Sequence, residues 1–161
     1  MTVKLAEELE RAAELCPLLA GLGREHLAKL LEIGEDRAFN QDEVIFGEGG
    51  KSECFFLITS GTVALEVFAG GKRILVQTLG PGDAMGWSAL TEKARTHFQA
   101  RPLSRVRAIG FSHTKLATAF EDDRDLGYQM MKRLLESATE CLDHTRMQVV
   151  DMYRNPGAAP R

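Results

Sequence analysis

Residues 44–63 read VIFGEGGKSECFFLITSGTV, and this stretch decides the fold class. Two short runs rich in β-branched and aromatic residues are separated by the turn GEGG, and the second run ends at Ser60-Gly61. Short strands joined by glycine turns, which allow a positive φ or a sharp bend, are typical of antiparallel sheets. The stretch therefore predicts consecutive antiparallel strands rather than strands joined by helices.

The same texture continues on both sides of this stretch. Between residues 37 and 111 the chain alternates short β-rich runs with glycine turns, and no window of helical length separates them. The predicted strands are 43–46, 54–59, 62–68, 73–79, 97–101 and 105–111. Strands so closely spaced favour an antiparallel roll or barrel over a parallel sheet.

Helical periodicity flanks the β-rich zone. Between residues 3 and 31 apolar residues recur at helical spacing, interrupted by Pro17 and by the turn Gly21-Leu22-Gly23, so two short helices are expected. Residues 113–153 are also predicted to be helical. The predicted class is α+β: an antiparallel β jelly roll, or double-stranded β-helix, with N-terminal helices and a long C-terminal dimerisation helix.

The long helix carries a heptad seam, in which apolar positions follow alternating spacings of 3 and 4 residues. The seam consists of Tyr128, Met131, Leu135, Ala138, Leu142, Thr145, Val149 and Met152. A seam of more than three heptads is the pattern of a coiled-coil interface, which predicts a homodimer. A second stripe of Met130, Leu134 and Cys141 is expected to face the chain's own β domain. The alternative is a helix packed wholly on its own domain.

Length and composition indicate one ordinary globular domain. The 161 residues suffice for a single core, and 44% of them are hydrophobic and 27% charged. A net charge of −3 disfavours non-specific binding of nucleic acids. We expect residues 1–155 to form the domain and residues 156–161 a flexible tail. No window is long enough to span a membrane and the N-terminus is not an apolar signal segment, so a cytoplasmic location is expected.

The residues that could carry metal or covalent chemistry are scattered. The three cysteines, Cys16, Cys54 and Cys141, lack the spacing of a zinc site, an iron–sulfur cluster or a disulfide framework. The four histidines do not form the paired ligands that metal-binding β rolls use. Gly50-Lys51-Ser52 looks like the end of a phosphate-binding P-loop, but Ile45 stands where that motif needs a glycine. We therefore expect neither a metal site nor catalytic activity.

The order of the elements resembles the cyclic nucleotide-binding domain family, to which catabolite activator-type regulators, protein kinase A regulatory subunits and nucleotide-gated channels belong. Residues 17–22, PLLAGL, resemble the family's opening helical turn, and residues 44–63 resemble its strand, glycine turn and "SG.V" hairpin. Residues 79–83, LGPGD, match the "L.PGD" that leads into the phosphate-binding cassette. The resemblance runs from about Pro17 to Val150 and implies a regulatory domain for which cyclic AMP or cyclic GMP is a possible ligand.

In this family the cassette follows the pattern Gly-Glu-x-Ala/Gly-Leu, then a loop, then Arg-Thr/Ser-Ala. Its short helix points backbone N–H groups at the cyclic phosphate, its arginine forks onto the phosphate oxygens, and its glutamate accepts the ribose hydroxyl. Here Gly86, Ala89 and Leu90 fit the pattern around the variable Ser88, but Trp87 replaces the glutamate. An indole has one donor and no acceptor, so Trp87 cannot accept the ribose hydroxyl.

Two residues compete for the position of the family's arginine. Counting back from the end of the last predicted strand places Thr96 there, whereas Arg95 reaches the position if the loop is one residue shorter. Arg95 then either faces the pocket or is a solvated loop residue. His97 and Arg101 are alternative anion partners if they point inward, and the other interpretation of His97 is a half-buried strand residue.

At the purine end, Cys141 stands where many family members present a hydroxyl from the long helix. A thiol is a weak donor, and Cys141 also fits as a small apolar packing residue. The sequence thus predicts a stand-alone regulatory sensor module that is impaired or non-canonical for cyclic AMP, with a pocket that is empty or holds a different anionic or apolar ligand. The alternative is a dimeric docking domain without a ligand. DNA binding by this chain alone is not expected, because no recognition helix follows the long helix.

Overall fold

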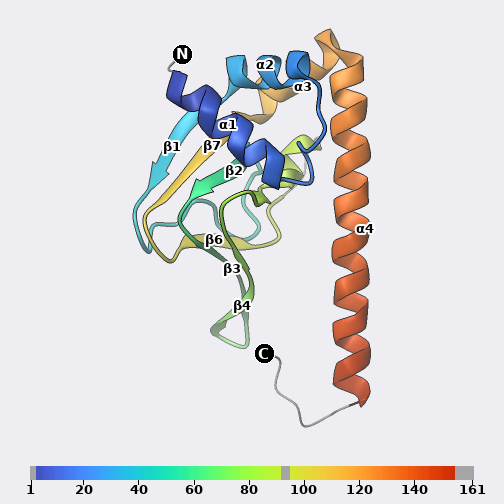
Figure 1. The fold of residues 1–161 in the computed structure, drawn as a ribbon. Helices are drawn as coiled ribbons and strands as arrows, with labels where there is room; N and C mark the ends of the chain where they lie inside the picture. The colour runs from blue at the N-terminus through green and yellow to red at the C-terminus, as the bar shows by residue number, and fades with distance from the viewer. Residues whose placement is uncertain (1–2, 92–94, 155–161) are drawn as a thin grey trace.

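The computed structural model describes residues 3–91 and 95–154. Its helices are α1 (Val3–Leu15), α2 (Arg24–Ile33), the short 3-10 helix η1 (Trp87–Leu90), α3 (His113–Asp122) and α4 (Arg124–Arg154). Figure 1 shows α1, α2 and α3 gathered at one end of a β roll, with α4 standing along its side. This arrangement confirms the predicted α+β class with N-terminal helices and a long C-terminal helix.

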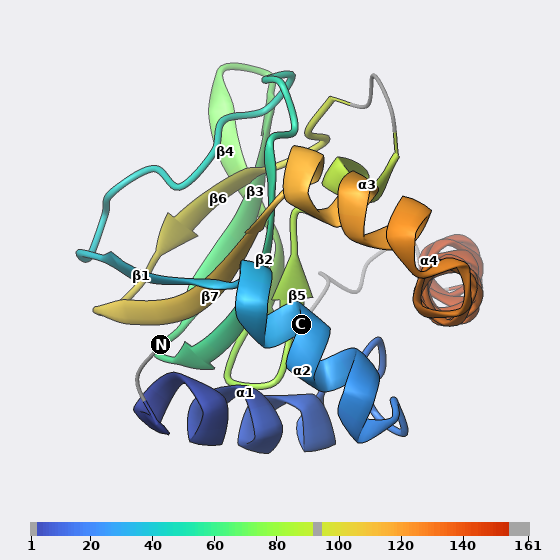
Figure 2. The ribbon, with the colours of Figure 1, turned by 90° about the horizontal axis from the view of Figure 1, so that it is seen from above.

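Two antiparallel sheets form the roll. The strands are β1 (Glu35–Phe39), β2 (Cys54–Ser60), β3 (Val63–Ala69), β4 (Lys72–Leu79), β5 (Ala84–Met85), β6 (Gln99–Pro102) and β7 (Val106–Ser112). One sheet has the order β1-β7-β2-β5 and the other the order β4-β3-β6, and every strand pair is antiparallel. Seen from above in Figure 2, the strands lie on one side of α3 and α4 is viewed almost along its axis. The predicted jelly roll is therefore confirmed.

Three strand predictions differ from the structure. The predicted strand 43–46 does not form, and only Phe46 makes an isolated bridge, to Ala100. Strand β1 was not predicted, because its sequence EDRAF is mostly exposed and lacks an alternating apolar pattern. It forms because it pairs along its whole length with β7. Strand β5 spans only two residues, too few to give a periodic signal.

Two hydrophobic clusters hold the elements together. One lies between the helices and the four-stranded sheet and includes the buried Leu9, Leu30, Leu126 and Met130. The other lies between the two sheets and is built by residues such as Ile58, Val63, Ala100 and Val106, all fully buried. Because Leu126 and Met130 belong to α4, the first cluster fixes the N-terminal half of that helix against the roll.

Asp123 separates α3 from α4. Its carboxylate accepts hydrogen bonds from the backbone N–H groups of Asp125 (3.1 Å) and Leu126 (3.0 Å), which caps the start of α4. It also forms an ion pair with Lys29 of α2, and this contact holds the pKa of Asp123 below its usual value. The cap and the ion pair together tie the start of α4 to α2.

The two stripes of α4 have different surroundings. Met130 is fully buried and Leu134 packs against the first cluster, so these two residues of the stripe face the chain's own domain. Five described seam residues are exposed: Tyr128, Leu135, Leu142, Thr145 and Val149. The helix is therefore not packed wholly on its own domain. The side chains of Cys141 and Met152, and the predicted tail 156–161, lie outside the described residues.

None of the described helices has both the length and the hydropathy needed to cross a bilayer.

Candidate functional site

The predicted cassette forms a turn followed by a short helix at the edge of the roll. Gly86 lies between β5 and η1 with φ 74°, in the left-handed region. A Cβ at this position would lie 2.5 Å from the carbonyl oxygen of Cys54, so no larger residue fits without a shift of the backbone. The chain can therefore pass this close to β2 and start η1 only with glycine at position 86.

Three contacts hold η1 in place. Ala89 is fully buried in the first cluster, and its carbonyl is hydrogen-bonded to Nδ1 of His113 at the start of α3. The hydroxyl of Ser88 lies 2.7 Å from that of Ser52. The sequence did not single out His113 for this role, because the contact joins residues 24 positions apart. The cassette backbone is thus fixed by packing as well as by its own turn.

The two candidates for the arginine position face different ways. Arg95 is exposed, and its guanidinium donates to the backbone carbonyl of Gly49 at 2.9 Å. Thr96 is only 5% exposed and lines the cavity described below. The structure therefore places Thr96 at the pocket and Arg95 on the turn beside it.

Thr96 is tied closely to the same turn. Its hydroxyl donates to the carbonyls of Gly47 and Gly50, and its backbone N–H donates to the Gly50 carbonyl at 3.0 Å. In return, the N–H of Gly49 donates to the Thr96 carbonyl at 2.7 Å. Because the turn consumes the single hydroxyl hydrogen of Thr96, toward any ligand this oxygen can only accept.

A cavity of about 440 Å³ lies between the cassette, the roll and α4. In Figure 1, the yellow-green η1 segment lies between the strands and the upper half of α4. The apolar lining residues of the roll and cassette are Phe46, Leu65, Met85, Trp87 and Phe98, and those of α4 are Met131, Leu134, Leu135 and Ala138. The polar side chains in the lining are Ser88, Thr91, Thr96 and His97. The volume is within the range of small-molecule sites.

Arg101 of β6 lies near the cavity in sequence, but its guanidinium is bound to carboxylates outside the cavity lining. Arg101 contacts both carboxylate oxygens of Glu66, at 2.6 and 3.1 Å, and the carboxylate of Asp42 at 2.6 Å. Glu66 is buried, and the Arg101 guanidinium holds its pKa below the usual range. Arg101 is therefore not an anion partner of the cavity. Among the described lining residues, only His97 can carry a charge.

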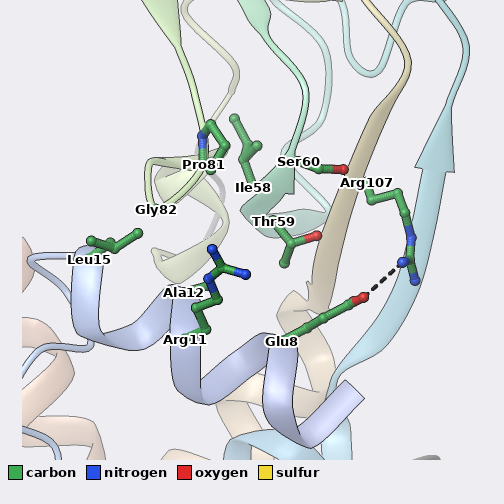
Figure 3. Close-up of a pocket in the computed structure, with 10 residues that line it drawn as sticks. All are labelled: Glu8, Arg11, Ala12, Leu15, Ile58, Thr59, Ser60, Pro81, Gly82 and Arg107. Carbon is green, nitrogen blue, oxygen red and sulfur yellow. Dashed lines mark hydrogen bonds and ion pairs between the residues drawn. The ribbon is translucent and has the colours of Figure 1, made fainter. Parts of the chain in front are cut away.

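A second hollow of about 300 Å³ lies beside α1. Figure 3 shows Glu8 reaching from α1 to Arg107 of β7, with Arg11 beside it and Pro81 and Gly82 opposite. Arg107 is bound to Glu8 and to Asp36, each at 2.8 Å. None of the predicted cassette residues lines this groove, so the cavity beneath α4 is the candidate site.

Two further residues, His97 and Cys141, were predicted as candidates for the site. His97 is among the residues that line the cavity, and it is exposed rather than half-buried. The prediction for Cys141 lies outside the described residues, because only its backbone in α4 is described. In the part of the chain that the structure covers, no group of three or more His, Cys, Asp or Glu residues is placed to hold a metal ion.

A family model described as "Cyclic nucleotide-binding domain" matches residues 36–123. A curated relative, the cyclic AMP receptor protein of Thermus thermophilus, is 27% identical over 108 residues, which are 66% of this chain and 46% of the relative. The chain thus spans about half the length of that relative.

Solved structures share the fold. The catabolite activator protein of Thermus thermophilus is 21% identical with a TM-score of 0.71, over 86% of this chain and 66% of that chain. A putative cyclic nucleotide-binding protein from Geobacter metallireducens is 26% identical with a TM-score of 0.70, over 83% of this chain and 96% of that one. The regulatory domain of Toxoplasma gondii PKA, crystallised with cAMP, is 21% identical with a TM-score of 0.69, over 74% of this chain and 46% of that chain.

Proposed function

Because the chain belongs to the cyclic nucleotide-binding domain family, we propose that it is a regulatory sensor module whose cavity beneath α4 is impaired for cyclic AMP. The module acts by binding rather than by catalysis, and we place it in the cytoplasm. The cavity is lined by the cassette residues Gly86, Trp87 and Ser88, by Thr96 and by α4.

The observation that carries this proposal is the polarity of the cavity lining. Trp87 lines the cavity where the family resemblance expects a ribose-binding glutamate, and the guanidinium of Arg95 is bonded to the Gly49 carbonyl. A cyclic nucleotide bound here would lose a forked arginine contact and a hydroxyl acceptor. Each loss costs about 1–3 kcal/mol, so the two together lower the affinity by roughly one to four orders of magnitude.

Isothermal titration calorimetry with cyclic AMP and with cyclic GMP tests the proposal. We expect no saturable heat in the low-micromolar range for either nucleotide. Saturable binding of either one in that range would contradict the impaired cassette. The cyclic AMP receptor protein of Thermus thermophilus serves as the positive control for the titration.

The sensor is proposed to act as a homodimer through the exposed seam of α4. Tyr128 is 64% exposed, Leu135 69%, Leu142 50% and Val149 46% in the single chain, an arrangement that favours a partner helix. Leu135 belongs to the seam and also lines the cavity, as do Met131 and Ala138. A ligand in the cavity would therefore contact the same helix that forms the proposed interface.

Sedimentation velocity tests the dimer with two matched variants. Leu142→Glu places a charge in the seam, whereas Met147→Glu places the same charge at an exposed apolar residue of α4 outside the seam. We expect Leu142→Glu to convert the dimer to monomer and Met147→Glu to leave it intact. Equal behaviour of the two variants, or a monomeric wild type, would rule out the seam interface.

A second candidate function is a dimeric docking domain without a ligand. It is favoured by the β3–β4 hairpin, which exposes Phe68, Ile74, Leu75 and Val76. Under this alternative, alanine substitutions of Trp87 and Arg95 leave partner binding unchanged. Under the sensor proposal, the substitution at Trp87 alters the response to a ligand.

A further inference from the structure

We propose that the cavity beneath α4 binds an uncharged, mostly apolar ring compound that carries a single N–H or O–H donor. This inference rests on the proposed function, because it assigns a ligand class to the same sensor cavity. The proposed function concerns weak binding of cyclic AMP, whereas this inference names the class of ligand that binds.

The first argument is that apolar side chains line the cavity from several sides. Leu65 and Met85 come from the two sheets, Phe46 and Phe98 from segments beside them, and Met131 and Leu134 from α4. A ligand enclosed by such walls is stabilised by about 25 cal/mol for each Å² of apolar surface that leaves water. Flat rings also suit the aromatic walls, because offset and edge-to-face contacts add to this burial.

The second argument is that none of the described lining residues is a lysine or an arginine, so only His97 could offset the charge of a bound anion there. The two arginines nearest in sequence, Arg95 and Arg101, are bonded to a backbone carbonyl and to carboxylates respectively. Moving Arg101 into the cavity would remove the closest partner of the buried Glu66, which would keep only the Gln99 amide at 3.3 Å and the Arg73 guanidinium at 4.0 Å. Desolvation of an anion without a partner is unfavourable, so the lining favours a neutral molecule.

The third argument concerns the kind of polar group that the ligand carries. Thr96 has already donated its hydroxyl hydrogen to the glycine turn, so its oxygen can only accept a hydrogen bond. A ligand N–H or O–H group satisfies this oxygen, whereas a ligand carbonyl does not. At Thr96, the lining therefore matches a ring compound that presents one donor.

Two fluorescent probes with the same ring system test the charge and polarity of the ligand. N-phenyl-naphthylamine is uncharged and carries one N–H, and anilinonaphthalene sulfonate adds an anionic sulfonate to the same rings. We expect the uncharged probe to bind saturably and at least about tenfold more tightly than the sulfonate. Equal binding of the two probes, or tighter binding of the sulfonate, overturns the proposal.

Trp87 reports where the probe binds. It is the single tryptophan of the chain and it lines the cavity, so excitation of Trp87 should transfer energy to a probe bound there. We expect probe emission on tryptophan excitation to saturate together with binding. Saturable binding without energy transfer would place the probe elsewhere and overturn the assignment to this cavity.

A matched pair of variants gives an independent check. Ala138→Phe enlarges a residue of α4 that lines the cavity, whereas Thr139→Phe makes the same ring at the next, exposed position. We expect Ala138→Phe to weaken the uncharged probe by at least about tenfold and Thr139→Phe to change its affinity by less than about twofold. Equal affinities for the two variants overturn the proposal. If circular dichroism shows that Ala138→Phe does not fold, the energy transfer from Trp87 to the probe in the wild-type protein tests the assignment to this cavity instead.

The failures of the two proposals are distinguishable. If neither probe binds and cyclic AMP does not bind, the ligand class is wrong and the impaired cassette stands. If cyclic AMP binds in the low-micromolar range, the impaired cassette is wrong whatever the probes do.

Discussion

The two polar walls of the cavity differ in what they retain from the cyclic nucleotide-binding domain family. The cassette wall, Gly86 to Leu90, has the left-handed glycine and short helix that the family resemblance predicts. In the opposite wall, Arg95 to Phe98, the guanidinium of Arg95 and the hydroxyl hydrogen of Thr96 are bonded to carbonyls of the turn 47–50, so at the cavity Thr96 offers an oxygen that can only accept.

The difference follows from what each wall packs against. Gly86 passes so close to the carbonyl of Cys54 that a Cβ would collide with it, and Ala89 is fully buried. These positions are constrained by the fold whether or not a ligand binds. By contrast, the side chain of Arg95 is exposed, and no packing requires it to face a phosphate. Under the proposed function, the family backbone persists although the side chains for its usual ligand have changed.

The largest expected effect is on the cassette wall. Gly86→Ala should destabilise the protein by about 3 kcal/mol, because strain at positive φ adds to a contact of 2.5 Å with Cys54. Gly70→Ala is the control: its φ is +59°, but no other heavy atom lies within 4 Å of the added Cβ, so about 1 kcal/mol is expected. Urea denaturation measures both. Equal costs would show that the close approach to β2 does not constrain Gly86.

A second prediction concerns Arg101, which is bound to Glu66 and does not line the cavity. Glu66→Gln should cost about 2 kcal/mol, because it weakens a buried, charge-assisted pair with Arg101. Glu53→Gln, which removes an exposed carboxylate 3.6 Å from Lys51, should cost less than about 0.5 kcal/mol.

The pH dependence of Glu66→Gln follows from the lowered pKa of Glu66. The ionised carboxylate contributes its stability at neutral pH, and this contribution is lost as the pH falls below the ordinary glutamate pKa of about 4.3. The stability difference between wild type and variant should therefore shrink in acid. A difference that is independent of pH would mean that ionised Glu66 does not stabilise the fold.

A smaller effect is expected when the cassette wall regains an acceptor. Trp87→Glu should raise the affinity for cyclic AMP by about tenfold, because a carboxylate can accept the ribose hydroxyl. Trp87→Leu removes the indole without adding an acceptor and should give a smaller gain. Calorimetry compares the two variants. If both gain equally, the bulk of the indole rather than its lack of an acceptor excludes the nucleotide.

The smallest effect is expected on the opposite wall. Arg95→Ala should change the free energy of unfolding by less than about 0.5 kcal/mol, because the side chain is exposed and makes one hydrogen bond to the Gly49 carbonyl. The uncharged probe should also bind as in the wild type. A loss of ligand binding in this variant would show that Arg95 does turn into the cavity.

Sequence patterns predicted the structural elements that are specified by residues close together in the chain. Glycine turns and β-rich runs predicted most of the roll, and the pattern around Gly86 predicted the position of Trp87 in the lining. The sequence could not separate Arg95 from Thr96, because a shift of one residue in the loop exchanges them. Only the pairing of Thr96 with the glycine turn resolves this. Strand β1 and the contact between His113 and Ala89 depend on distant partners and had no local signal.

Amide NMR of the wild-type protein tests the central claim most directly, because it detects weak binding and locates it. The backbone N–H groups of Gly86 and Ala89 report on the cassette wall. We expect their resonances to stay in place when cyclic AMP is added to about 100 µM, and to shift saturably when N-phenyl-naphthylamine is added. Saturable shifts of these resonances with low-micromolar cyclic AMP would contradict the account.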